Sequence, residues 1–178
     1  MKIMKFGGTS VGKPERMHQV ADLITRDQEP KIVVLSALSG TTNALVDISN
    51  SLAKSDREAA KQKIDALELH YRSFIQSLLK TAPLLEKAGR IVTEHFEFLQ
   101  IILRISFSDA LNKDILAQGE LMSTKLFSCY LEEAGIAHAL IPALEFMRID
   151  ANEEPSLPAI RHNLQEILAQ QHSQKLFI

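Results

Sequence analysis

The sequence predicts an α/β fold that combines parallel strands with an inserted antiparallel helical hairpin. Residues 3–4 form an apolar stub before a glycine-rich turn and a helical pattern that starts at Pro14. Residues 31–37 form a continuous, largely β-branched run, which is typical of a strand covered on both faces. Two long amphipathic patterns then follow within residues 55–107. Together these features indicate a parallel sheet with a pair of helices added to it.

The order strand, helix, strand predicts a right-handed parallel crossover. The helix should run from Pro14 to about Asp27, and Pro30 should end that unit. Parallel strands point their carboxyl ends the same way, so the turns at residues 7–8 and 36–40 should lie side by side. Open α/β sheets bind ligands at that edge.

The hairpin should begin at Ser55, because Ser55 and Glu58 have the spacing of a capping box. Apolar residues then recur at helical spacing in two helices separated by Pro83. We assign this hairpin no chemistry, since such stripes usually pack. We expect His95, which falls in the second stripe, to have a hydrogen-bonded packing role. The positions predicted to be buried are Ala60, Ile64, Leu67, Tyr71, Phe74, Leu78, Leu84, Ala88, Ile91, His95, Leu99 and Ile102.

The last third of the chain predicts one more long helix and several short elements. Ser108 and Asp109 should cap a helix that runs to about Ala134 and ends at Gly135. Residues 137–141 read as a short strand, residues 146–150 as an extended piece or loop, and residues 158–170 as an amphipathic helix. Residues 176–178 begin a strand-like run, so we expect a truncated fold.

The glycine turn at residues 7–8 suits a phosphate site, because backbone N–H groups can approach an anion there and Lys5 adds a full positive charge. The alternative is an ordinary turn that requires positive φ. Residues 7–13 also match the Walker A spacing. However, Pro14 replaces the Ser or Thr that would bind Mg²⁺, and Ser36 follows the next strand where a Walker B motif has Asp. We therefore reject the P-loop interpretation.

The second turn supplies hydroxyl groups before a helix, and Thr41 or Thr42 could serve as an N-cap worth about 1 kcal/mol. Gly119 interrupts the long helix, which costs roughly 1 kcal/mol relative to Ala and suggests a close approach to its backbone. Glu120 beside it could be functional or simply exposed.

Composition excludes several classes of protein. The 178 residues suit one domain, and 46% hydrophobic with 24% charged residues is ordinary for a globular protein. A net charge of −2 gives no footprint for nucleic acid or an anionic membrane. No signal peptide or membrane span is recognisable. The single Cys129 and the dispersed histidines favour neither disulfide nor metal site, and the cytoplasm is expected.

Three segments resemble motifs of the aspartokinases, within the amino acid kinase family. These segments are Lys-Phe-Gly-Gly-Thr-Ser-Val at residues 5–11, Val-Val-Leu-Ser-Ala-Leu-Ser-Gly-Thr-Thr-Asn at residues 33–43 and Gln-Gly-Glu-Leu-Met-Ser-Thr at residues 118–124. The resemblance implies a parallel-sheet sandwich of the amino acid kinase type. Residues 1–178 would be the N-terminal, substrate-side part of the kinase domain, with residues 55–107 as the hairpin insertion. The nucleotide-binding half and the regulatory domains would be absent.

The resemblance also implies an activity, namely transfer of a phosphoryl group from ATP to the β-carboxylate of L-aspartate, the first step toward lysine, threonine and methionine. ATP, with Mg²⁺ bound through its phosphates, and L-aspartate would be the ligands, and a homo-oligomer is implied. Lys5 would be catalytic, with no metal held by side chains. The nucleotide would be bound by Lys5, Phe6, Gly7 and Gly8, and the aspartate by Thr42 and Glu120, with Ser36 and Ser39 in the same pocket.

Four features that the family places farther along the kinase domain are not found in this chain. They are a second lysine, an aspartate that organises the reaction, the adenine pocket and an arginine that binds the substrate. We therefore expect the chain alone to be inactive. Two alternatives stay open. The chain could belong to a kinase of another small acid, such as glutamate or acetylglutamate, or it could be a non-catalytic interaction module.

Overall fold

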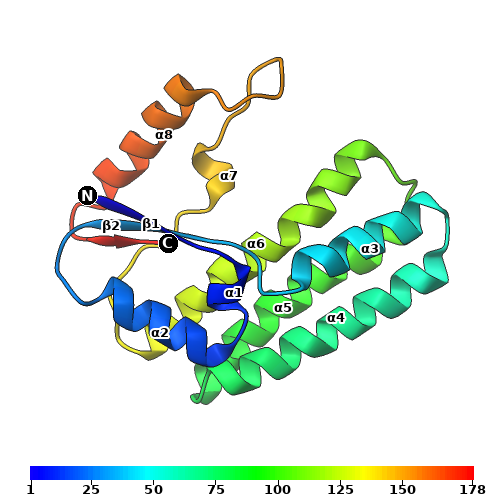
Figure 1. Ribbon diagram of the computed structural model, residues 1–178, viewed down its shortest axis with the longest axis horizontal. Coiled ribbons are helices and arrows are strands. Elements are labelled where there is room, and N and C mark those ends of the chain that lie inside the picture. Colours follow the sequence, from blue (N-terminus) through cyan, green and yellow to red (C-terminus); the bar gives the residue numbers. More distant parts are fainter.

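The computed structural model describes all 178 residues and has the predicted α/β architecture, with a three-stranded parallel sheet beside a layer of helices (Figure 1). The strands are β1 (Lys2–Phe6), β2 (Lys31–Leu35) and β3 (Leu176–Phe177). The helices are α1 (Gly8–Val11), α2 (Pro14–Ile24), α3 (Thr41–Ala53), α4 (Arg57–Leu78), α5 (Ala82–Ile102), α6 (Asp109–Glu133), α7 (Ala143–Phe146) and α8 (Leu157–Gln170).

The sheet has the order β1-β2-β3 with every pair parallel, so both ends of the chain lie at the sheet (Figure 1). The register of the first pair runs from Lys2 opposite Lys31 to Phe6 opposite Leu35. The predicted strand at residues 137–141 is reduced to one bridge, in which Ala139 pairs with Phe177. Since β3 has only two residues, it offers little edge for a longer partner.

Only one face of the sheet is covered, which corrects our expectation for β2. Val33 and Leu35 are buried in the core, whereas Val34 is 44% exposed and Ile3 on β1 is 73% exposed. The β-branched run instead reflects the position of β2, which pairs with a strand on each side. Branched side chains favour such a pleated position even where one face is open.

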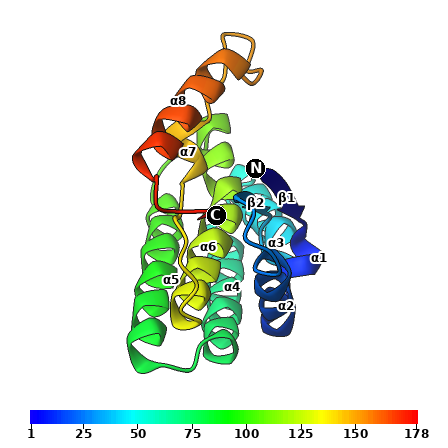
Figure 2. The same ribbon diagram turned by 90° about the vertical axis from the view of Figure 1, so that its left-hand side faces the viewer.

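The helices α3, α4, α5 and α6 pack against one another in a bundle beside the sheet (Figure 2). Within it α4 and α5 form the predicted antiparallel hairpin, and the predicted stripe of α4 from Ala60 to Leu78 is buried. The cap differs from the prediction. Ser55 has φ of +59°, outside the extended region that an N-cap needs, and the Asp56 carboxylate accepts the Ala59 N–H at 3.0 Å instead.

His95 has the hydrogen-bonded packing role that we predicted. Its Nδ1 lies 2.6 Å from Oε1 of Gln118, and its Nε2 lies 2.9 Å from Nζ of Lys125. Burial lowers the pKa of His95, which favours the neutral ring. A neutral ring donates to Gln118 through Nδ1 and accepts from the lysine through Nε2. This contact fixes α5 against α6.

The ends of α6 agree with the prediction. The Ser108 hydroxyl accepts the Leu111 N–H at 3.2 Å, and Gly135 at φ of +68° follows the helix. Residues 143–146 form the short helix α7, where we expected an extended piece or loop only from residue 146. In Figure 1, α8 lies on the opposite side of the sheet from α2, but none of its residues is buried, so it does not cover that face. No helix combines the length and apolar character needed to cross a membrane.

Candidate functional site

The candidate site lies at the carboxyl ends of β1 and β2, where Phe6 and Leu35 are paired. Gly7 follows β1 and Ser36 follows β2, so the two turns leave the sheet next to each other. They are in contact, as predicted, because a Cβ on Gly8 would lie 3.1 Å from the Ala37 carbonyl oxygen.

Close packing requires two of the three glycines in the first turn. A Cβ on Gly12 would lie 2.4 Å from Cβ of Ser39, and Gly8 is similarly close to the backbone of that turn. None of the three has positive φ, so the alternative of an ordinary turn that requires it is not supported. Gly7 has φ of −77° and open space around the position of a Cβ. Neither conformation nor packing within this chain therefore requires glycine at position 7.

This turn offers hydrogen-bond donors and a cation that the chain does not use. The N–H groups of Gly7 and Gly8 donate to no acceptor within the protein. The Lys5 side chain is exposed on the open face of the sheet and takes part in no ion pair. The Phe6 side chain packs against the core, so only its backbone faces this edge. Free amides form an environment suited to an anion, and the exposed amine of Lys5 stands two residues before them in the chain.

The second turn is held by a different residue from the one we expected. Gly40, at φ of +83°, is the N-cap of α3, so neither Thr41 nor Thr42 caps the helix. This left-handed backbone places Thr41 inside the first helical turn, where it is buried with its hydroxyl 3.1 Å from the hydroxyl of Tyr71. Thr42 is exposed and its hydroxyl has no partner within the chain.

Helix α6 reaches the same turn through Gly119. A Cβ at this position would lie 2.7 Å from Cβ of Ala37 and 3.1 Å from Cγ2 of Thr41, which explains a glycine in the middle of a helix. The next residue, Glu120, is exposed, and one of its carboxylate oxygens accepts the Ala37 N–H at 3.3 Å. The Ser123 hydroxyl also donates to the Ser36 carbonyl at 2.7 Å. Helix α6 therefore fixes both the turn and the carboxylate beside it.

The structure brings together most of the predicted site residues. Gly8, Ser36, Ser39 and Glu120 all lie at the contact between the two turns and α6, with Gly7 and Thr42 in the same two turns. Lys5 contacts none of these side chains, because it lies on the open face of β1. No group of three His, Cys, Asp or Glu residues is arranged to hold a metal ion.

Sequence reasoning missed three supporting residues, namely Gly12, Tyr71 and Ser123. Gly12 had a usable signal, because it lies in the same glycine-rich segment. Ser123 lies in the motif at residues 118–124, but a serine within a helix gives no indication of which turn its hydroxyl reaches. Tyr71 had no signal, because it stands in an apolar stripe.

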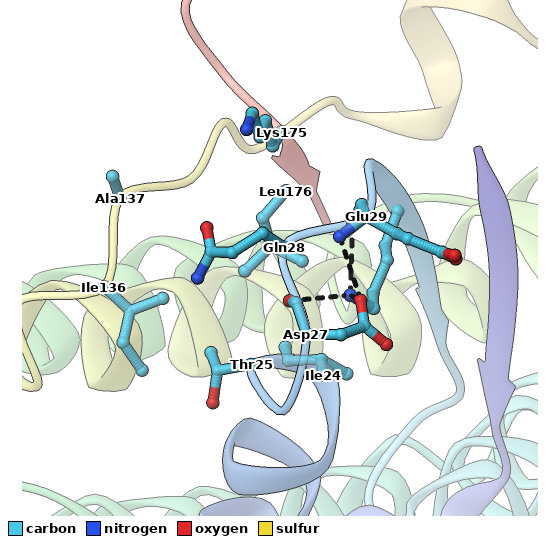
Figure 3. Close-up of a pocket in the computed structure, with 10 residues that line it drawn as sticks. Ile24, Thr25, Asp27, Gln28, Glu29, Ile136, Ala137, Lys175 and Leu176 are labelled. Carbon is cyan, nitrogen blue, oxygen red and sulfur yellow. Dashed lines mark hydrogen bonds and ion pairs between the residues drawn. The ribbon is translucent and has the colours of Figure 1, made fainter.

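A hollow of about 200 Å³ lies at the opposite, amino-terminal edge of the sheet (Figure 3). Here four charged groups, those of Lys2, Lys31, Asp27 and Glu29, are paired with one another. The buried Lys31 amine contacts the Asp27 carboxylate and donates to the carbonyls of Asp27 and Glu29, each at 3.1 Å. Lys2 pairs with Glu29 at 2.7 Å and with Asp27 at 3.5 Å. Hydrogen bonding from Lys31 lowers the pKa of Asp27 to about 2. The Gln28 amide and the Lys175 amine, which also line this hollow, have no partner within the chain.

Comparison with known proteins identifies the family of this chain. The model of the amino acid kinase family matches residues 1–175. The chain belongs to this family. Its relatives include the lysine-sensitive aspartokinase 3 of Escherichia coli, 30% identical over 89% of this chain, and the chloroplastic aspartokinase 2 of Arabidopsis thaliana, 39% identical over 75% of it.

Solved structures of this amino acid kinase family share the fold. The crystal structure of E. coli aspartokinase III with aspartate and ADP aligns with 99% of this chain at a TM-score of 0.82 and 26% identity. The structure of the same enzyme with lysine and aspartate gives the same values. The chain matches 35% of the E. coli relative and 25% of the Arabidopsis relative. It thus spans about a third of their length or less.

Proposed function

We propose that the whole protein containing this chain is an aspartate kinase, which transfers the γ-phosphoryl group of ATP to the β-carboxylate of L-aspartate. One observation carries the proposal. The carboxyl edge of the sheet has unused N–H groups on Gly7 and Gly8, and a free amine on Lys5, next to a turn that holds Glu120. Similarity to aspartokinases over most of the chain favours aspartate as the acceptor.

Residues 1–178 would then be the N-terminal, substrate-side part of the kinase domain, with residues 55–107 as the hairpin insertion. The nucleotide-binding half and any regulatory domains would lie outside this chain, and we expect a homo-oligomer. Under this proposal residues 1–178 alone have no turnover. Aspartate-dependent release of ADP by these residues alone would contradict that part of the proposal.

The acceptor needs no general base. A carboxylate with a pKa near 3.9 is already ionised at neutral pH. One of its oxygens attacks the γ-phosphorus while the bond from that phosphorus to the bridging oxygen breaks, and ADP leaves with the electron pair. The product is 4-phospho-L-aspartate, and no proton is transferred.

The main task of the site is to bring two anions together. Two unit charges 4 Å apart repel by about 4 kcal/mol at an effective dielectric of 20. The Lys5 amine would neutralise the transferred group, while the N–H groups of Gly7 and Gly8 would donate to its oxygens and the backbone of Phe6 would border the phosphates. Mg²⁺ bound through the nucleotide phosphates would supply further positive charge.

The aspartate would lie against the second turn and α6. One oxygen of Glu120 is used by the Ala37 N–H, which leaves the other for the α-ammonium group of the substrate. The exposed hydroxyl of Thr42 would bind the same molecule. Ser36 and Ser39 would line the same pocket, because they follow β2 at this edge.

The test is ADP release by the whole protein with aspartate, glutamate or acetylglutamate as acceptor. We expect turnover with aspartate and little with the other two. Glu120→Gln keeps the shape but removes the charge, and should raise the KM for aspartate about 10- to 100-fold, as for loss of a charge-assisted hydrogen bond. Glu132→Gln, on the same helix, removes only a surface pair with Lys87 and is the matched control. Preference for another acid would contradict aspartate as the acceptor. No turnover with any of the three acids would favour the alternative of a non-catalytic interaction module.

A further inference from the structure

The hairpin helix α4 contributes a buried hydroxyl to the turn after β2. Tyr71 is fully buried, and its side chain reaches Thr41 at the start of α3. The two hydroxyl oxygens are 3.1 Å apart, and Thr41 is itself only 1% exposed. A hydroxyl pair sealed from water in this way is held firmly, because each group would lose its partner if the turn moved.

The surroundings of Thr41 give this contact particular weight. Beside it, the interface between α3 and α4 opens into a hollow of about 390 Å³, lined by residues that include Gly40, Thr41, Leu67 and His70. The hollow lies at the rim of a packed interface, because Leu45 on α3 and Leu67 and Tyr71 on α4 are all buried. The hydroxyl pair adds a directional polar link to that packing at the start of α3.

The Tyr71 hydroxyl also lies within electrostatic range of the carboxylate on α6. Desolvation raises the pKa of Tyr71, and the negative charge of Glu120 adds to that rise. The tyrosine therefore stays neutral and keeps its proton. The two hydroxyls share a single hydrogen bond, in which either can be the donor, so only one of the two hydroxyl hydrogens is used in it.

We propose that Tyr71 is a positioning residue, which fixes the first turn of α3 so that Thr42 and Glu120 face aspartate in the correct geometry. This inference rests on the proposed function above. It gives the hairpin a role in substrate binding, through one hydroxyl rather than through its surface. Tyr71 would not contact the reacting atoms itself.

The experiment compares Tyr71→Phe and Thr41→Val with the unmodified whole protein. Each variant removes one hydroxyl and little volume. Each should raise the KM for aspartate about three- to tenfold, the loss expected for one hydrogen bond, with kcat and the KM for ATP nearly unchanged. The double variant should be no worse than the single variants, because both remove the same bond. Thr41→Ser, which retains the hydroxyl, should restore the normal KM.

Tyr130→Phe is the matched control, since Tyr130 is the only other tyrosine and stacks on His18 with ring centroids 4.4 Å apart, away from the turn. It should leave the KM for aspartate unchanged. The inference is wrong if Tyr71→Phe leaves that KM unchanged, if the effects of Tyr71→Phe and Thr41→Val add, or if both KM values rise in parallel with a lower melting temperature. If the unmodified protein does not phosphorylate aspartate, the proposed function fails first.

Discussion

The two edges of the sheet contain similar groups that are used in opposite ways. At the amino edge, Lys2 and Lys31 are bound to the carboxylates and carbonyls of Asp27 and Glu29. At the carboxyl edge, Lys5 has no acidic partner, although it lies only three residues from Lys2 on the same strand. Paired charges stabilise the fold at the amino edge, whereas the unused donors at the carboxyl edge indicate where a ligand would bind.

The largest expected effect separates the two lysines of β1. Lys5→Ala in the whole protein should lower kcat by about 10²- to 10³-fold, because it removes a cation from the transferred phosphoryl group. Lys2→Ala should leave kcat unchanged, since it removes only an exposed pair at the opposite edge. Steady-state kinetics of the two variants measure the difference. Equal effects of the two substitutions on kcat would contradict the different roles assigned to the two lysines.

Two glycines near the carboxyl edge, Gly7 and Gly12, should also differ in their effects on stability and on substrate binding. Gly12→Ala would place a Cβ 2.4 Å from Ser39, and should destabilise the protein by roughly 1–3 kcal/mol through overpacking. Gly7→Ala meets open space at a φ that alanine adopts freely, so the free energy of unfolding should hardly change. Instead it should raise the KM for ATP, because a methyl group would crowd the phosphates. Denaturant unfolding and kinetics on both variants test this, and a stable Gly12→Ala variant would contradict it.

At the amino edge, Lys31→Met should lower stability without touching catalysis. The amine is buried and binds a carboxylate and two carbonyls, so its loss should cost roughly 1–3 kcal/mol in the free energy of unfolding. The activity of the folded protein should be unchanged. Lys61→Met, which removes one exposed pair with Asp65, is the control and should cost little.

The smallest expected effect concerns how the free energy of unfolding changes at acidic pH. The folded-state pKa of Asp27 is lowered to about 2, below its ordinary value near 3.8. Its contribution to stability is therefore complete above pH 4 and is lost as the pH falls from about 4 to about 2. Asp27→Asn should flatten stability against pH in that window and lower stability at neutral pH by the same amount, because the substitution removes the contribution that acid removes in the unmodified protein. An unaltered acid profile in this variant would contradict the assignment.

Local patterns were enough to predict much of the fold. The parallel strands, the hairpin stripe on α4, the Ser108 cap and the helix end at Gly135 all depend on residues close together in the chain. The errors arose where distant contacts or backbone geometry decide. Asp56 rather than Ser55 caps α4, Gly40 rather than a threonine caps α3, and the exposure of Val34 depends on which elements cover the sheet.

The candidate site was predictable only in part for the same reason. The motifs drew attention to Gly8, Ser39 and Glu120, which the fold brings together. The packing of Gly119 on Ala37 and the reach of Tyr71 to Thr41 join segments that are 82 and 30 residues apart (119 − 37 and 71 − 41). No spacing in the sequence could show these two contacts.

The central claim is that the free N–H groups of the glycine turn receive the phosphates. The most direct measurement is a nuclear magnetic resonance titration of the isotope-labelled whole protein with ADP and aspartate. We expect the amide signals of Gly7 and Gly8 to shift strongly, while those of Glu29 and Lys31 stay in place. Binding with unmoved glycine signals, or with shifts confined to the amino edge, would contradict it.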